Sequence, residues 1–335
     1  MKGLIIPKDY SPVLGVRETQ KAIKFIKDTF QKELSRALGL ERISAPLFVT
    51  KESGINDDLN GVERKVAFEA KELSGEIEIV QSLAKWKRTA LKHYGFGVGE
   101  GLYTDMNAIR RDDDVDNVHS IFVDQWDWEK VIAREDRNSE YLKDTVKKIV
   151  GAVADTNDRA REAFPALSAN ISRDVFFITS EELLKLYPDL TPKDREKEIT
   201  RLHGTVFIMQ IGGELSDGKP HDGRAPDYDD WSLNGDIIVW DDVLGEQLEL
   251  SSMGIRVDSD SLKEQLTKSG HGDRLRFDYH RAIAKDELPL TIGGGIGQSR
   301  ICMFIMQKAH IGEVHCSVWP EEMRAECERG GIALL

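Results

Sequence analysis

The chain is constrained most strongly by a glycine-rich stretch near its C-terminus, Gly293-Gly294-Gly295-Ile296-Gly297-Gln298-Ser299-Arg300. Glycines at positions 293, 295 and 297 remove three side chains from one face of an extended segment, so a flat ligand could lie against bare backbone. We expect this segment to run into a buried apolar helix, at whose start Arg300 and the backbone amides would both favour phosphate. The stretch matches neither the Rossmann fingerprint nor a P-loop. A glycine-rich turn with a surface arginine is the alternative.

Composition limits the class of protein. The 335 residues carry a net charge of −13, which argues against broad binding to nucleic acid or to an anionic membrane. No apolar run approaches the roughly 18 residues of a membrane span, and the N-terminal residues do not resemble a signal peptide. The three cysteines lack metal-ligand spacing. We therefore expect a soluble, reduced, cytoplasmic protein, whose length leaves room for one large domain or two.

Periodicity and turn signals predict the order of the elements. Helices are expected at 18–38, 81–91 (with Ser82 as N-cap), 139–163, 180–202 and 260–268. Strands are expected at 42–49 (containing Pro46), 77–80, 101–110, 121–128, 174–178, 206–211, 236–240 and 246–251. Loops are expected at 51–65, at 111–117 and, as an acidic lid, at 216–232. Strands joined by hairpins, with helices inserted between groups of them, predict an α+β fold built on an antiparallel sheet flanked by helices.

Several polar side chains fall at informative places on this sheet. Arg110 ends one hairpin strand, and Gln125 and Asp127 lie two residues apart on the return strand, so they share a face. Asp236 and Glu249 are expected at the ends of adjacent strands, where carboxylates could hold a metal ion for a nucleotide. Each of these residues alone also fits an exposed structural role. Their order along the chain, together with the glycine stretch, favours a nucleotide site.

That order resembles the catalytic core of class II aminoacyl-tRNA synthetases. The helix at 18–38 with the strand carrying Pro46 resembles the first motif, which forms the dimer interface. Arg110 and the following hairpin resemble the second, and the glycine stretch resembles the third, Gly-x-Gly-x-Gly-x-x-Arg. Within the class the resemblance is to the aspartyl and asparaginyl branch. Ser299 departs from the pattern, because the synthetase motif usually has an acidic residue there.

A shorter relative is more similar still, the ammonia-dependent asparagine synthetase (aspartate–ammonia ligase) family. The resemblance runs from about residue 20 to 320, and it implies one catalytic domain over 1–335 with a core over about 17–320. The strings that carry it are Ser82-Leu83-Ala84-Lys85-Trp86-Lys87-Arg88, Gly99-Glu100-Gly101-Leu102-Tyr103-Thr104, Val123-Asp124-Gln125-Trp126-Asp127-Trp128-Glu129, Arg224-Ala225-Pro226-Asp227-Tyr228-Asp229-Asp230-Trp231, Glu249-Leu250-Ser251-Ser252-Met253-Gly254-Ile255-Arg256 and the glycine stretch.

The resemblance implies an ATP- and Mg²⁺-dependent ligase that makes L-asparagine from L-aspartate and ammonia through a β-aspartyl-adenylate, releasing AMP and pyrophosphate. It implies catalytic roles for Arg110, Arg300, Lys87 and Asp57. The implied substrate-binding residues are Asp57, Ser82, Lys87, Gln125, Asp127, Ser252 and Gly295. The implied ATP-binding residues are Arg110, Arg224, Asp229, Asp236, Glu249 and Arg300, with Asp236 and Glu249 as the metal ligands.

Two other functions stay open at this stage. An aspartyl- or asparaginyl-tRNA synthetase core would share these motifs, although they begin near residue 17 and we expect no anticodon-binding domain before them. A non-catalytic paralogue would have no need to keep the phosphate- and metal-binding residues. The expected partners are L-aspartate, ammonia, ATP and a second copy of the chain in a homodimer, without nucleic acid or membrane.

Overall fold

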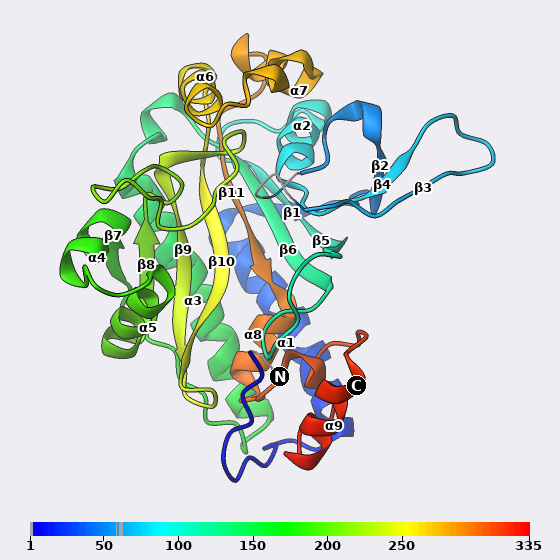
Figure 1. The fold of residues 1–335 in the computed structure, drawn as a ribbon, viewed down its shortest axis with the longest axis vertical. Helices are drawn as coiled ribbons and strands as arrows, with labels where there is room; N and C mark the ends of the chain where they lie inside the picture. Colours follow the sequence, from blue (N-terminus) through cyan, green and yellow to red (C-terminus); the bar gives the residue numbers. More distant parts are fainter. Residues whose placement is uncertain (1–2, 58, 60–62) are drawn as a thin grey trace.

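A computed structural model describes residues 3–57, 59 and 63–335. Within these residues, eight strands form the main sheet, in the spatial order β1-β5-β6-β11-β10-β9-β8-β7 (Figure 1). The strands are β1 (Leu40–Arg42), β5 (Gly101–Ile109), β6 (Phe122–Val131), β7 (Phe176–Thr179), β8 (Thr205–Met209), β9 (Asp229–Asp241), β10 (Glu246–Arg256) and β11 (Thr291–Gly297). The predicted antiparallel pairing is confirmed for the six central strands, whereas the edge pairs β1–β5 and β7–β8 are parallel.

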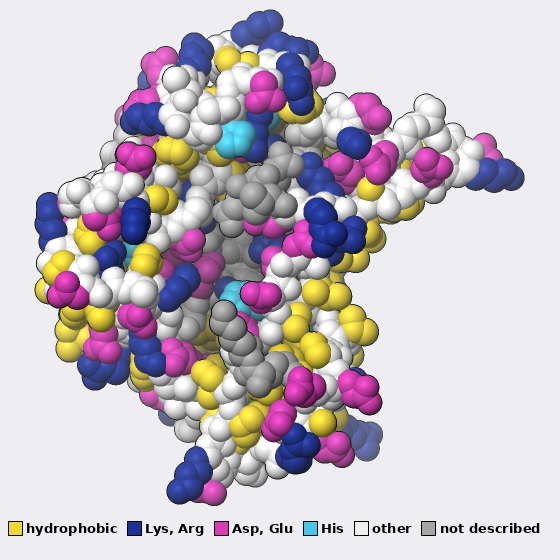
Figure 2. Space-filling model, in the orientation of Figure 1, with side chains coloured by type: hydrophobic (Ala, Val, Ile, Leu, Met, Phe, Trp, Pro, Cys, Tyr) yellow, Lys and Arg dark blue, Asp and Glu magenta, His cyan; other side chains and the backbone are white. Residues whose placement is uncertain are grey.

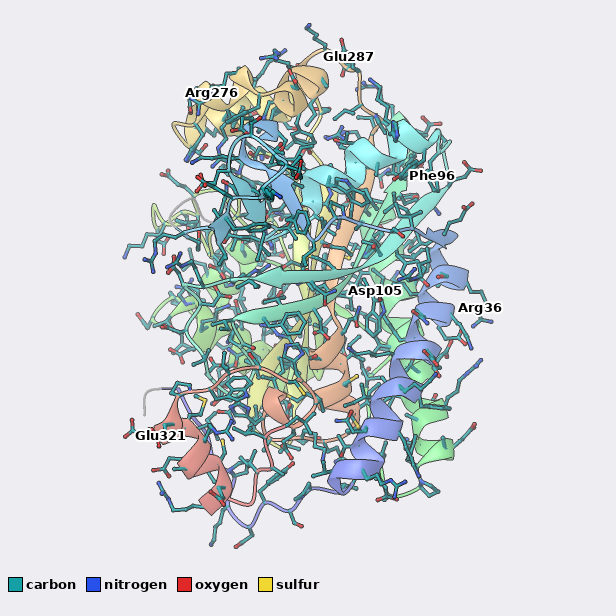
Figure 3. The ribbon with its side chains drawn as sticks, turned by 90° about the vertical axis from the view of Figure 1, so that its right-hand side faces the viewer. Arg36, Phe96, Asp105, Arg276, Glu287 and Glu321 are labelled. Atoms are coloured by element: carbon teal, nitrogen blue, oxygen red, sulfur yellow. The ribbon has the colours of Figure 1, made fainter. Side chains whose placement is uncertain are left out.

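One face of the sheet carries the hydrophobic core. It is covered by α1 (Val16–Leu38), α3 (Ser139–Ala163) and α8 (Gln298–Ile305). In α1, Ala22, Ile26, Phe30 and Leu34 recur every four residues and are fully buried, and the helix ends at Gly39 with φ 71°. Figure 3 shows α1 along the side of the molecule, with Arg36 near its end pointing outward. On the other face, a smaller apolar cluster covers β7, β8 and β9, and the polar residues predicted above lie around the middle strands.

The remaining helices lie around the open face and at the ends of the sheet. They are α2 (Ala84–Tyr94), α4 (Ser180–Leu186), α5 (Pro192–His203), α6 (Ser259–Lys268), α7 (Asp278–Ala284) and α9 (Glu321–Arg329). A small second sheet in the order β2-β4-β3 extends from the body as an arm, built from β2 (Phe48–Thr50), β3 (Ala67–Phe68) and β4 (Ile77–Ile79). No helix in the described ranges is long and apolar enough to cross a membrane.

Several predicted boundaries and one predicted helix cap were wrong. The strand expected at 42–49 is two strands in different sheets, because Pro46 between them has no N–H for a ladder. The helix expected at 180–202 is divided into α4 and α5 by the segment that contains Pro188. The expected lid at 216–232 ends earlier, since β9 begins at Asp229. Ser82 is not the N-cap of α2: Leu83 is, and the Ser82 hydroxyl accepts a hydrogen bond from Ala84 N–H at 3.1 Å.

Candidate active site

A cavity of about 570 Å³ opens on the face of the sheet opposite the core. Figure 2 shows this face hollowed near its middle, where acidic and basic side chains gather. Its walls come from β6, β10, β11, the start of α2, and the loops before β6 and β9. Among the predicted site residues, all of which are described, the cavity is lined by Asp57, Ser82, Lys87, Arg110, Gln125, Asp127, Arg224, Asp229, Glu249, Ser252, Gly295 and Arg300. Asp236 lies just behind this lining.

A buried ion pair stands at one side of the cavity. Lys87 on α2 and Asp127 on β6 are almost inaccessible to solvent, and the Lys87 Nζ atom lies 2.6 Å from Asp127 Oδ1. The same Nζ donates to the carbonyl oxygen of Gly294 at 2.9 Å. Lys87 therefore links α2, β6 and the glycine strand, and it places one cation where a carboxylate group could be held.

The glycines of β11 leave space for the cavity at some positions and for a buried protein side chain at another. A Cβ atom on Gly295 would overlap the Gln125 side chain, and Gly294, Gly295 and Gly297 line the cavity. A Cβ atom on Gly293 would instead overlap Glu129, which is fully buried and forms an ion pair with Arg256 at 2.7 Å. The expectation that all three alternate glycines leave backbone open to a ligand is thus wrong at Gly293, where a protein side chain fills the space.

Arg256 is the centre of a buried charged network that residue-by-residue reasoning did not single out. Its guanidinium pairs with Glu129 and with Asp229, and the Thr291 hydroxyl donates to Glu129 Oε1 at 2.7 Å. Burial would raise the pKa of Glu129, but the charge of Arg256 outweighs this and lowers it. The predicted ATP ligand Asp229 is therefore held in an ion pair at the cavity wall. The sequence did carry a signal for this network, because two of the strings that resemble the aspartate–ammonia ligase family, 123–129 and 249–256, end in Glu129 and Arg256.

Two further arginines face the cavity from separate elements. Arg110 directly follows β5, and its Nε donates to the carbonyl oxygen of Gln81 at 3.3 Å. Arg300 lies in the first turn of α8, where its Nη1 donates to the carbonyl oxygen of Glu249 at 2.9 Å. The acidic loop after Arg110, which belongs to the hairpin that resembles the second synthetase motif, also lines the cavity through Asp112, Asp113, Asp114 and Asp116.

Asp236 and Glu249 do not lie at strand ends as expected, but within the long β9–β10 hairpin. The Ser252 hydroxyl oxygen lies 2.7 Å from Asp236 Oδ1 and 2.9 Å from Glu249 Oε1. Burial raises the pKa of Asp236, even though Arg224 Nη2 donates to it at 2.6 Å. Burial would also raise the pKa of Glu249, but nearby cations, Arg300 first among them, outweigh this and lower it. The hairpin thus presents one carboxylate that ionises readily and a second one behind it.

These two carboxylates fit a magnesium site that substrate phosphates would complete. In the described part of the chain, no three His, Cys, Asp or Glu side chains form a ready metal cage. Mg²⁺ does not need one, because it keeps several waters and binds through one or two carboxylates plus phosphate oxygens. Glu249 lines the cavity, whereas Asp236 Oδ1 accepts hydrogen bonds from both Arg224 and Ser252.

Asp57 enters the cavity from a loop that is tied to the body. Asp57 is buried, and its Oδ1 accepts a hydrogen bond from Leu59 N–H at 3.2 Å. The preceding residue, Asn56, accepts from Gln81 N–H at 3.0 Å and donates to Glu78 at 3.1 Å. Asp57 and Ser82 therefore approach the cavity together. Positions 58 and 60–62 of the predicted loop lie outside the described residues.

Comparison of the fold places the chain in a structural class. An asparaginyl-tRNA synthetase from Entamoeba histolytica in complex with asparaginyl-adenylate matches 90% of this chain with a TM-score of 0.63 and 16% identity, and the chain covers 66% of that structure. An asparaginyl-tRNA synthetase from Pyrococcus horikoshii complexed with the same adenylate has a TM-score of 0.62 at 15% identity, over 90% of this chain and 70% of that one. The fold is therefore that of the class II aminoacyl-tRNA synthetase catalytic core.

Sequence comparison is more specific. The family model for aspartate-ammonia ligase matches residues 17–331. An aspartate–ammonia ligase from Ligilactobacillus salivarius is 58% identical over 334 residues, 99% of each chain, and one from Bacillus cytotoxicus is 57% identical over 97% of this chain and 99% of its own length. The chain belongs to the aspartate–ammonia ligase family, as its motifs predicted.

Proposed function

We infer that this chain is an ATP-dependent ligase that makes L-asparagine from L-aspartate and ammonia, releasing AMP and pyrophosphate. The aspartate β-carboxylate oxygen attacks the α-phosphorus of ATP, and the bond from that phosphorus to the pyrophosphate oxygen breaks. Ammonia then attacks the activated carbonyl carbon, and AMP leaves. The observation that carries this proposal is the near full-length match to the family, which coincides with a cavity that has cations on both sides of a glycine strand.

Arg110 and Arg300 serve the first step. Bringing a carboxylate to a triphosphate is electrostatically repulsive, so fixed cations must offset the charge. The two guanidinium groups come from different elements and line the same cavity, so they would contact the α-phosphate from two sides. Arg224, which also lines the cavity and is paired with Asp236, is proposed to contact ATP when the site is filled.

We assign Glu249 and Asp236 to the magnesium ion, with Glu249 as the more direct ligand because it lines the cavity. Bound Mg²⁺ supplies neutralising charge to the departing pyrophosphate. The chain's own residues keep these carboxylates ready: the cations around Glu249 favour its ionised form, and Ser252 holds the two carboxylates together.

The aspartate substrate is proposed to bind with its α-carboxylate at Lys87. Its β-carboxylate must point to the phosphate, so the other carboxylate is left for the buried cation on the far side. Asp127, next to Lys87, would accept hydrogen bonds from the substrate ammonium group, with Gln125, Ser82, Ser252 and Gly295 closing around the amino acid. Asp57 is proposed to take the proton that the attacking ammonia loses.

The test is incubation with ATP, Mg²⁺, ammonium and aspartate labelled with ¹⁸O in its β-carboxylate, without tRNA. AMP and asparagine should form in equal amounts, and the label should appear in AMP, because the carboxylate oxygen remains on the phosphorus when AMP leaves. AMP formation without asparagine, or asparagine without labelled AMP, would contradict the mechanism. A requirement for tRNA would support the second candidate, a synthetase-like core, which the shared fold alone favours.

We further propose a cytoplasmic homodimer formed through α1 and the segment around Pro46. Leu47 and Phe48, next to Pro46, leave about half of their surface exposed, and burying such side chains against a second copy would remove apolar area from water.

A further inference from the structure

The turn that carries Arg300 is fixed by side chains of two neighbouring strands. Gln298 Nε2 donates to Asp105 Oδ1 at 3.0 Å and to the carbonyl oxygen of Gln125 at 3.2 Å (Asp105 is labelled in Figure 3). The next residue, Ser299, donates its backbone N–H to Asp124 Oδ1 at 3.1 Å. These contacts hold residues 298 and 299, so the start of α8 is anchored immediately before Arg300.

Asp124 on β6 receives three hydrogen bonds at its carboxylate. In addition to the Ser299 N–H, its Oδ2 accepts from the Ser299 hydroxyl at 2.9 Å and from Lys27 Nζ on α1 at 2.8 Å. Burial would raise the pKa of Asp124, but the charges of Lys27 and His315 and these hydrogen bonds lower it. An ionised carboxylate against the first N–H groups of a helix stabilises that end of the helix.

Ser299 is held from its other side as well. Its Oγ lies 2.9 Å from Nδ1 of His315, whose Nε2 lies 2.9 Å from the carbonyl oxygen of Phe122. Ser299 is 1% exposed, so neither its hydroxyl nor its backbone can shift without moving His315 or Asp124.

Arg300 itself is less firmly held at its tip. One guanidinium nitrogen donates to the Glu249 carbonyl oxygen at 2.9 Å, but its Nε reaches the carbonyl oxygen of Val118 only at 3.4 Å, and a fifth of the side chain is exposed. The direction of the guanidinium therefore depends largely on where the backbone of α8 begins. Charge stabilisation in a transition state requires donors that are already in place.

We propose that Asp124 and Ser299 are positioning residues for Arg300, with Lys27 neutralising a carboxylate that would otherwise repel the phosphates of ATP. The proposal rests on the proposed function, since it assumes that Arg300 contacts the α-phosphate. In this proposal α1 has two roles. It packs on the sheet, and through Lys27 it supports the turn that carries Arg300.

A double-mutant cycle tests the proposal on the intact enzyme. Asp124→Asn keeps the size of the side chain and removes the charge. It should lower kcat by about 10²-fold, the scale expected when a catalytic group is misplaced by about 1 Å, with little change in KM for aspartate. In an Arg300→Ala background the same substitution should cost almost nothing more, because the residue that it positions is gone. Glu33→Gln is the matched control: Glu33 is a buried carboxylate on α1, paired with Arg36 and Arg159 away from the cavity, and kcat should stay normal.

The proposal would be overturned if the fold reduction of kcat in the double variant equalled the product of the two single reductions, because the two residues would then act independently. Normal kcat in Asp124→Asn would overturn it as well. If Asp124→Asn fails to fold, Ser299→Ala gives the same cycle with a smaller change, because it removes only the hydroxyl that Asp124 and His315 share. Failure of the proposed function would look different, since the wild-type protein would then make no asparagine from ATP, aspartate and ammonium.

Discussion

The Lys87 Nζ atom lies 2.6 Å from Asp127 Oδ1, and both side chains are almost completely buried at the wall of the cavity. A buried cation and carboxylate side by side match the α-ammonium and α-carboxylate groups of an amino acid, each facing its opposite. The pair is therefore suited to the proposed pose, in which it holds the backbone end of aspartate and leaves the β-carboxylate free.

Lys87→Ala should weaken aspartate binding strongly and leave ATP binding nearly intact. Truncating one partner of a buried charge pair costs about 2–5 kcal/mol, because the other charge stays buried. Aspartate and ATP affinities can be measured separately by calorimetry. Lys92→Ala, an exposed lysine on the same helix, should leave both unchanged.

The pose is tested by L-aspartate 1-amide, which keeps the β-carboxylate and lacks the α-charge. The wild-type enzyme should discriminate against this analogue, and Lys87→Ala should discriminate much less. Full wild-type discrimination by the variant would show that another cation holds the α-carboxylate.

Arg110→Ala and Arg300→Ala should each lower turnover by roughly 10²–10³-fold, the cost of removing one preorganised donor to a developing charge. Steady-state AMP formation measures the effect. Arg111→Ala is the control, because Arg111 is exposed and lies next to Arg110 in the chain. Near-normal turnover in either variant would remove that arginine from the mechanism.

The assembly should have twice the 37.8 kDa mass of the chain in light scattering at micromolar concentration. Phe48→Glu should shift the protein toward the monomer, because it places a charge in the proposed interface. Leu202→Glu should not, because Leu202 is an apolar residue near the end of α5 that is even more exposed than Phe48 and lies outside the proposed interface. A fully active wild-type monomer would contradict the dimer.

Acid should destabilise the protein through His310. This ring is fully buried, its Nδ1 accepts from Gly312 N–H at 3.0 Å, and burial lowers its pKa from 6.5 to about 4. Above pH 6.5 the folded and unfolded states are both neutral at this ring. Between pH 6.5 and 4 only the unfolded state takes the proton, so the free energy of unfolding falls, by about 2 kcal/mol at pH 5.

Urea denaturation at pH 7 and pH 5 measures that change. His310→Gln should lose less stability over this interval than the wild type, whereas His93→Gln, at an exposed histidine, should lose as much as the wild type. Equal losses in the His310 variant and the wild type would show that His310 is not responsible.

Much of the fold could be predicted because the signals were local. The repeat of apolar residues in α1 and α3, and the glycine run before Arg300, each fix an element from within its own sequence. The strings that resemble the aspartate–ammonia ligase family then indicated which residues to expect at the site. What could not be predicted depends on partners far away in the chain. Glu129 fills the space at Gly293 across a strand pair, and Asp236 lies mid-strand because the β9–β10 hairpin is longer than its apolar segments.

Ser299 shows the same limit at the site itself. Its sequence position suggested only a departure from the usual acidic residue. Asp124 on β6, 175 residues earlier in the chain, accepts hydrogen bonds from Ser299, and no spacing rule connects the two.

Among the described residues, each lysine and arginine that lines the cavity has a partner inside the protein. The pairs are Lys87 with Asp127, Arg224 with Asp236, Arg256 with Glu129 and Asp229, Arg300 with the side chain and the carbonyl oxygen of Glu249, and Arg110 with the carbonyl oxygen of Gln81. Where a substrate carboxylate or phosphate displaces such a partner, binding is an exchange and its free energy is a difference between two similar interactions. Substrates should consequently bind less tightly than their number of contacts suggests. When the products leave, the internal pairs close again, so the described lysine and arginine side chains of the emptied site keep their partners.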